Sequence, residues 1–194
     1  MGRPRQFDMD SVLSGAMQAF WQHGYAATSL AELSDCTGLG SGSLYAAFGS
    51  KHALFERTLA RYLEVNTEAD VAVLEDAEDV PAAIEELLVG VVEAHLGDPH
   101  ARGCLAVNAA IELAGREEAV TEAVRRVFTR VEDALFAALT RGQAAGTVAR
   151  TANPRAQARY VLNALYGLRV LGTAATDRAP LLDAANLTLA NLRP

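Results

Sequence analysis

Apolar residues recur at helical spacing along almost the whole chain. In the first such stretch, residues 10–23, they return every three or four positions, at Val12, Leu13, Ala16, Met17, Phe20 and Trp21. Strict alternation of apolar and polar residues, which is typical of half-buried strands, is almost absent. Glycine and proline are scarce inside the periodic stretches and so do not interrupt them. The pattern therefore predicts an all-α protein of about nine helices.

Caps and breaks set the expected helix boundaries. Gly24 ends the first helix, and Ser50 caps the fourth. Proline in the first turn starts the fifth helix at Pro81 and the eighth at Pro154. From the fourth helix onward, the expected ranges are 51–74, 81–96, 102–114, 117–144, 154–175 and 179–192.

The second and third helices are short and separated by a glycine turn. Thr28 can cap the second helix with its hydroxyl, and Gly38 ends it. In the third helix, Leu44 and Phe48 share an inner face, while the small polar residues 41–43 face outward. This arrangement indicates a helix-turn-helix whose outer face could meet DNA.

The ordered residues of this region resemble the N-terminal signature of TetR/AcrR-family transcriptional regulators. They read Gly24-Tyr25-x-x-Thr28-Ser29, then Gly38-Leu39-x-x-Gly42-Ser43-Leu44-Tyr45-x-x-Phe48-x-Ser50-Lys51-x-x-Leu54. The resemblance covers roughly the first 55 residues. It implies a helix-turn-helix domain over residues 1–50 and a helical ligand-binding and dimerisation domain over 51–194. It also implies a homodimeric repressor that leaves a palindromic DNA operator when a small-molecule effector binds.

The resemblance also assigns DNA contacts to particular residues. Thr28 and Tyr45 would touch phosphates, Lys51 would face the DNA backbone, and Ser41 and Ser43 would lie near base edges. The expected DNA-binding set is Arg3, Arg5, Thr28, Ser29, Ser41, Gly42, Ser43, Tyr45 and Lys51. Arg3 and Arg5 are interpreted either as a basic arm along the DNA or as a disordered tail.

The third helix departs from the family pattern at Gly40, Ser41, Ala46 and Ala47, where the family often has larger or polar residues. Few of its side chains could make bidentate contacts to bases. We therefore expect phosphate contacts, the arm and DNA shape to contribute more than direct base readout.

A polar stripe marks the expected sixth helix. His100, Cys104, Asn108 and Glu112 recur every four residues, and Gly103-Cys104-Leu105 with Asn108 looks like a subgroup of the family. The stripe could line a ligand cavity, hold a metal ion, or be ordinary packing. The expected ligand-binding set is Tyr62, Cys104, Asn108, Glu112, Phe128 and Tyr166. Cys104 is either an inert core residue or a thiol that senses electrophiles or oxidants.

The eighth helix is apolar almost all round, so it must be covered on two sides. We expect it to form a four-helix dimer interface with the ninth helix and their copies, the alternative being two core helices of a monomer. The expected interface residues are Leu162, Leu165, Leu168, Leu182 and Leu189. The fourth helix, shared between the domains, would tilt on ligand binding and change the spacing of the two DNA-binding heads.

Composition and charge limit the function classes. The net charge is −7, and residues 1–55 carry three Lys or Arg against four Asp or Glu, so charge alone does not indicate DNA binding. The two cysteines are expected to be free thiols, and no metal-ligand spacing or cofactor motif is present. Neither a signal peptide nor a membrane-spanning segment is expected, which favours the cytoplasm.

No catalytic motif is found, so we expect no enzyme. The competing function is a helical protein-interaction module without sequence-specific DNA binding.

Overall fold

The computed structural model describes residues 8–100, 102–150 and 152–194, and these residues form nine α-helices, one short 3-10 helix and no strand. The helices are α1 (Met9–Ala27), α2 (Leu30–Thr37), α3 (Ser41–Phe48), α4 (Lys51–Glu75), α5 (Val80–Gly97), α6 (Leu105–Leu113), α7 (Glu118–Ala145), α8 (Pro154–Leu171) and α9 (Ala179–Ala190). The 3-10 helix, Gly172–Ala174, continues α8. The all-α prediction is confirmed.

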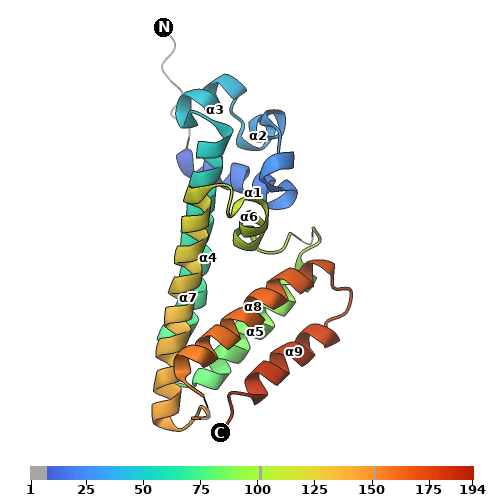
Figure 1. The fold of residues 1–194 in the computed structure, drawn as a ribbon. Helices are drawn as coiled ribbons and strands as arrows, with labels where there is room; N and C mark the ends of the chain where they lie inside the picture. The colour runs from blue at the N-terminus through green and yellow to red at the C-terminus, as the bar shows by residue number, and fades with distance from the viewer. Residues whose placement is uncertain (1–7, 101, 151) are drawn as a thin grey trace.

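Two long helices form the spine of the molecule. α4 and α7, of 25 and 28 residues, lie side by side along its length (Figure 1). Helices α1–α3 sit at the end of the spine where α4 begins, and α5, α8 and α9 pack at the opposite end (Figure 1). α6 lies between these two groups and contacts α1, α4, α7 and α8.

The buried apolar side chains form two clusters. One cluster joins α1–α3 to the first half of α4, to α6 and to the start of α7, with Phe20, Leu33 and Phe55 at its centre. The other joins the second half of α4 to α5, α7, α8 and α9. The first cluster means that the end formed by α1–α3 is not a separate globule, because its core continues into α6.

Most expected helix boundaries are confirmed, and two differ. α6 begins at Leu105 instead of residue 102, with Cys104 as its N-cap. α8 ends at Leu171 instead of residue 175, where the 3-10 helix takes over. The expected break at Gly24 is confirmed by its non-helical backbone, with a φ of 78°, and a short helical continuation of α1 follows it to Ala27. Within the described ranges, no helix is long and apolar enough to cross a membrane.

Candidate DNA-binding surface and ligand pocket

The turn between α2 and α3 is built from local backbone signals. Ser29 and Glu32 form a reciprocal capping box at the start of α2, which satisfies two backbone N–H groups. Hydrogen bonding of the Glu32 carboxylate to the backbone amide and side chain of Ser29 lowers the pKa of Glu32. Gly38 ends α2 with a φ of 67°, which glycine adopts without strain. Leu44 and Phe48 then bury the inner face of α3.

The outer face of α3 is exposed and small. Ser41, Gly42, Ser43 and Ala46 are exposed, and Tyr45 has 47% of its surface accessible. The Ser41 hydroxyl lies 3.1 Å from the Ser34 hydroxyl on α2. Among the described residues, no side chain caps the start of α3, because the N-cap residue is Gly40. This face offers hydroxyls, amides and one aromatic ring to a groove of DNA.

Thr28 does not belong to this surface. Its side chain is only 1% exposed, and its hydroxyl donates to the carbonyls of Gly24 and Ala19. The expectation that Thr28 caps α2 and that its side chain touches a phosphate is therefore wrong. Ser29 is the cap, because its extended backbone directs its hydroxyl at the Glu32 amide.

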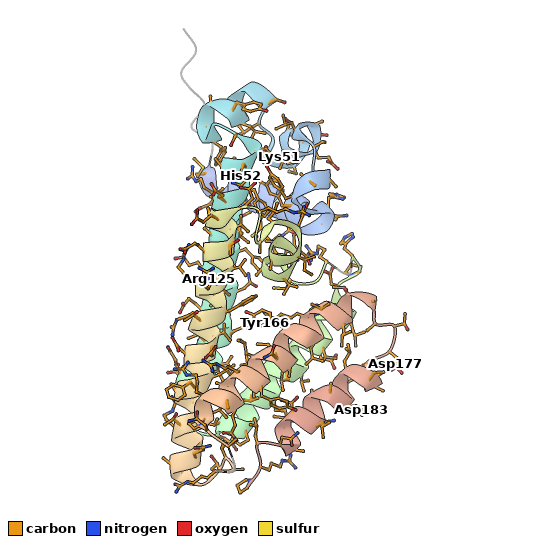
Figure 2. All side chains as sticks on the ribbon, viewed as in Figure 1. Lys51, His52, Arg125, Tyr166, Asp177 and Asp183 are labelled. Atoms are coloured by element: carbon orange, nitrogen blue, oxygen red, sulfur yellow. The ribbon has the colours of Figure 1, made fainter. Side chains whose placement is uncertain are left out.

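Lys51 is the only lysine of the sequence, and it begins α4 beside the helix-turn-helix (Figure 2). Its ammonium group donates to the Ala26 carbonyl at 3.3 Å and lies 4.7 Å from the centre of the Tyr25 ring. These contacts hold the cation at the edge of the α3 face. Arg3 and Arg5 lie outside the described residues.

A pocket of about 190 Å³ opens where α1, α4, α5 and α8 meet the segment before α6. Aromatic and charged side chains line most of it. The lining residues are Trp21, Tyr62, Asn66, Val91, Ala94, His95, Asp98, Arg102, Gly103, Cys104 and Arg169. Its volume is smaller than the roughly 300 to 1,000 Å³ of drug-sized ligand sites, so it could hold only a compact molecule, but the mixture of rings and fixed polar groups is typical of a ligand site.

Hydrogen-bond donors surround the sulfur of Cys104, which is 3% exposed. The Tyr62 hydroxyl donates to Sγ at 3.6 Å, and the Arg169 guanidinium lies at 3.8 Å from it. Arg169 also pairs with Asp70 of α4 at 2.6 Å, and both side chains are largely buried. Burial raises the pKa of the Tyr62 hydroxyl, so Tyr62 remains a donor. The sulfur therefore has two polar neighbours from different helices, Tyr62 of α4 and Arg169 of α8.

Tyr166 adds a buried polar group next to this cluster. It points from α8 toward the α4 and α7 pair (Figure 2), and its ring meets Phe128 edge to face at 4.6 Å between centroids. The hydroxyl is buried and has no hydrogen-bond partner in the described part of the chain. Burial raises its pKa. An unpaired buried hydroxyl is costly, so it marks a place for a water molecule or a ligand atom.

The structure brings together only part of the expected ligand-binding set. Tyr62 and Cys104 line the pocket, and Phe128 and Tyr166 contact each other. The Asn108 amide donates to the Arg102 carbonyl and supports the pocket rim. The Glu112 carboxylate instead accepts the backbone amides of Tyr25 and Ala26, so its expected role in orienting a ligand is corrected.

The four-residue stripe does not exist as one helical face. His100 lies in the turn before α6, Cys104 caps the helix, and only Asn108 and Glu112 are inside it. Over residues 8–100, 102–150 and 152–194, no group of three or more His, Cys, Asp or Glu side chains is placed to hold a metal ion. Sequence reasoning missed Trp21, His95 and Arg169 as pocket residues, because their positions read as helix core or helix ends.

The expected dimer residues divide into two groups. Leu165, Leu168 and Leu189 are buried in the protomer's own core, which corrects their placement on a dimer surface. Leu162 and Leu182 are partly buried against the same core. The exposed apolar residues on α8 and α9 are instead Tyr160, Val170, Leu171 and Leu187.

A helix-turn-helix that continues through one long helix into a helical bundle with a small polar and aromatic pocket is the architecture of a DNA-binding regulator. Residues 12–58 match the model of bacterial regulatory proteins of the tetR family, and residues 81–187 match the tetracyclin repressor-like C-terminal domain. The chain therefore belongs to the TetR family, and it is a DNA-binding transcriptional regulator.

Relatives match along nearly the full chain. The chain is 30% identical to the uncharacterized HTH-type transcriptional regulator YezE of Bacillus subtilis, over 99% of this chain and 100% of that protein. It is 27% identical to the HTH-type transcriptional repressor ComR of Escherichia coli, over 97% of this chain and 90% of that protein. The solved structures include a cysteine mutant of the TetR family regulator CifR with a 26-base-pair operator. That structure is 34% identical, with a TM-score of 0.84, and the match covers 97% of this chain and 98% of the other.

Proposed function

We propose that the protein is a homodimeric repressor that binds a palindromic operator and releases it when a small molecule occupies the pocket beside Cys104. The observation that best supports DNA binding is the exposed outer face of α3. The repressor role is supported by the similarity to the transcriptional repressor ComR, and DNA binding through this fold by the operator complex of CifR. Such a regulator works on the chromosome, which supports a cytoplasmic location.

The domain boundary is proposed to fall at the start of α4, near residue 50. The first family model ends at residue 58, early in α4, and the second begins at residue 81, in α5. α4 itself runs through both apolar clusters. The two parts therefore differ in role but share a helix and a core.

The DNA-binding residues are proposed to be Ser41, Ser43 and Tyr45 on α3, with Lys51 beside them. A test combines Tyr45→Phe with Lys51→Ala and measures the affinity for a duplex selected from a randomised pool by the wild-type protein. We expect at least a tenfold loss of affinity, because phosphate contacts are lost from both subunits. Arg193→Ala, which removes an exposed cation near the C-terminus, is the control and should bind normally. Equal affinity of all three proteins would refute this assignment.

The effector site is tested by filling the pocket. Ala94 is an exposed pocket-lining residue of α5, and Ala82 is an exposed residue of the same helix outside the pocket. Small molecules that raise the melting temperature of the wild type should fail to stabilise Ala94→Phe and should still stabilise Ala82→Phe. The same molecules should release the selected duplex from the wild type. A molecule that acts equally on both variants binds elsewhere.

A thiol sensor at Cys104 is a second candidate, and the two donors that face its sulfur favour it. In the reaction, the thiolate attacks the carbon of an electrophile such as iodoacetamide, a sulfur–carbon bond forms, and iodide leaves. Cys36 is exposed and would react too, so the test uses Cys36→Ser as background. Iodoacetamide should then release DNA from this protein and not from its Cys104→Ser derivative. Release from both would exclude the thiol sensor.

A further inference from the structure

Helix α1 of the DNA-binding end forms one wall of the pocket. The Trp21 indole lines the pocket, and its Nε1 donates to the Gly103 carbonyl at 2.8 Å. The Tyr62 ring meets it edge to face at 5.1 Å, and the Arg102 guanidinium lies 4.4 Å from the indole centre. Three neighbours of this indole are therefore pocket residues themselves. A movement of these pocket residues must therefore change the surroundings of Trp21, a side chain of the DNA-binding domain.

A second contact lies at the other end of α6. One carboxylate oxygen of Glu112 accepts the Tyr25 amide at 2.8 Å, and the other accepts the Ala26 amide at 2.6 Å. Both amides follow the break at Gly24, where the backbone leaves the helical conformation, so they lack the usual intrahelical acceptor. A charged acceptor makes these hydrogen bonds strong.

Gly24 allows this contact for two reasons. Its φ of 78° is one that other residues adopt only with strain, and a Cβ there would lie 3.1 Å from a Glu112 oxygen. The break in α1 and the carboxylate on α6 therefore fit each other. Beyond them, α1 leads directly to Thr28 and the start of the helix-turn-helix.

We propose that Trp21 and Glu112 form a junction that couples the pocket directly to the DNA-binding domain through α1. Gly103 lies directly before the N-cap of α6 and Glu112 lies in its last turn, so a shift of this helix moves both contacts of α1 at once. The junction supplies a route in addition to α4, whose Tyr62 and Asn66 also line the pocket. This inference rests on the proposed effector pocket.

Coupling between two sites is reciprocal, so operator binding must alter the junction even when no effector is present. Trp21 is the only tryptophan of the sequence, and its emission therefore reports on the junction alone. The experiment titrates the selected operator duplex into the wild-type protein. It follows Trp21 emission together with the anisotropy of a label on the DNA. A scrambled duplex of equal length corrects for absorption by DNA.

Glu112→Gln keeps the shape and one acceptor oxygen but loses the charge and the second acceptor. Glu86→Gln, exposed on α5, is the matched control. We expect the wild type and Glu86→Gln to show an emission change that saturates with DNA binding. In Glu112→Gln the change at saturating operator should fall at least threefold, and the operator affinity should fall about threefold to tenfold.

Two results would overturn the junction. One is a Trp21 emission of the wild type that stays constant while the anisotropy shows saturated operator binding. This measurement uses the wild type alone and so does not depend on the folding of a variant. The other is an equal emission change in Glu112→Gln and the wild type. Neither result touches the proposed repressor function, because operator binding and effector release are measured independently. A duplex that binds but is never released by any pocket ligand would instead count against the proposed function.

Discussion

Gly15 shows how one missing side chain fixes the geometry of the DNA-binding end. A Cβ at this position of α1 would collide with the Cys36 carbonyl oxygen, which belongs to the backbone of α2. Backbone atoms cannot turn aside as the end of a flexible side chain can. The close approach of α1 and α2 therefore depends on glycine here.

Gly15→Ala should destabilise the protein by about 1 to 3 kcal/mol, because the two helices must move apart and loosen the core below α3. The measurement is the free energy of unfolding in urea, together with operator affinity. Gly90→Ala is the control, since nothing lies within 4 Å of the position on α5. That variant should be stabilised by about 0.5 to 1 kcal/mol through its higher helix propensity. Equal stability of the two variants would contradict the close approach.

Asp98, which lines the pocket, makes the stability of the folded protein depend on pH. The Arg102 side chain donates to its carboxylate, as do the amides of Arg102 and His100, and these bonds lower the pKa of Asp98 from 3.8 to about 2. A lowered pKa means that the folded state prefers the charged form. The charged Asp98 therefore stabilises the folded state fully above about pH 4, and this stabilisation is lost as the pH falls toward 2.

Asp98→Asn should therefore cost about 1 to 2 kcal/mol of unfolding free energy at about pH 6, and the cost should shrink as the pH falls from about 4 to about 2. Urea titrations at several pH values measure the difference from the wild type. Asp183→Asn, exposed on α9, is the control and should show no such dependence (Figure 2). A cost that stays constant over this range would show that the carboxylate charge is not responsible.

At the scale of the elements, the sequence predicts most of the fold because helix signals are local. Periodic apolar residues, the Ser50 cap, and proline in the first turn place α4, α5 and α8 close to their observed starts. Gly38 likewise fixes the turn between α2 and α3.

The errors concern residues whose partners are distant in sequence. Glu112 finds its partners 86 and 87 residues away, at the end of α1, and no spacing rule could connect them. Leu165 and Leu168 face the protomer core because α5 and α7 cover that side of α8. Periodicity shows that a face is apolar but does not show which neighbour covers it.

The exposed apolar face of α8 and α9 leads to a prediction about assembly. Leu187→Glu, at a residue 64% exposed on α9, should convert the proposed dimer into monomers, because a charge would be buried between the copies. Sedimentation analysis measures the mass. Val65→Glu, at a residue 63% exposed on α4, is matched in size and exposure and should leave the assembly unchanged. Dimers in both variants would place the interface elsewhere.

For the molecule as a whole, the distribution of charge predicts how DNA binding responds to salt. Each cation that neutralises a phosphate adds about 0.9 to the slope of log affinity against log salt. Arg3 and Arg5 supply two of the three Lys or Arg residues among the first 55. An arm on each subunit of a dimer therefore accounts for a large share of the expected cations.

Removal of residues 1–7 should reduce this slope by about 2 to 4 if the arms contact DNA. Operator affinity measured from low to moderate salt gives the slope. Arg193→Ala, near the opposite end of the chain, removes one cation per subunit far from α3 and should leave the slope unchanged. An unchanged slope after the deletion would mean that the arms do not contact DNA.

The bare outer face of α3 also bears on how this regulator can acquire new target genes. Ser41, Ser43 and Ala46 are exposed, whereas Leu44 and Phe48 hold the helix in place from the other side. A change such as Ala46→Asn introduces a side chain able to pair with adenine without disturbing the core or the pocket. Target choice and effector response can therefore diverge independently, and the chain is a scaffold that can be retargeted one exposed position at a time.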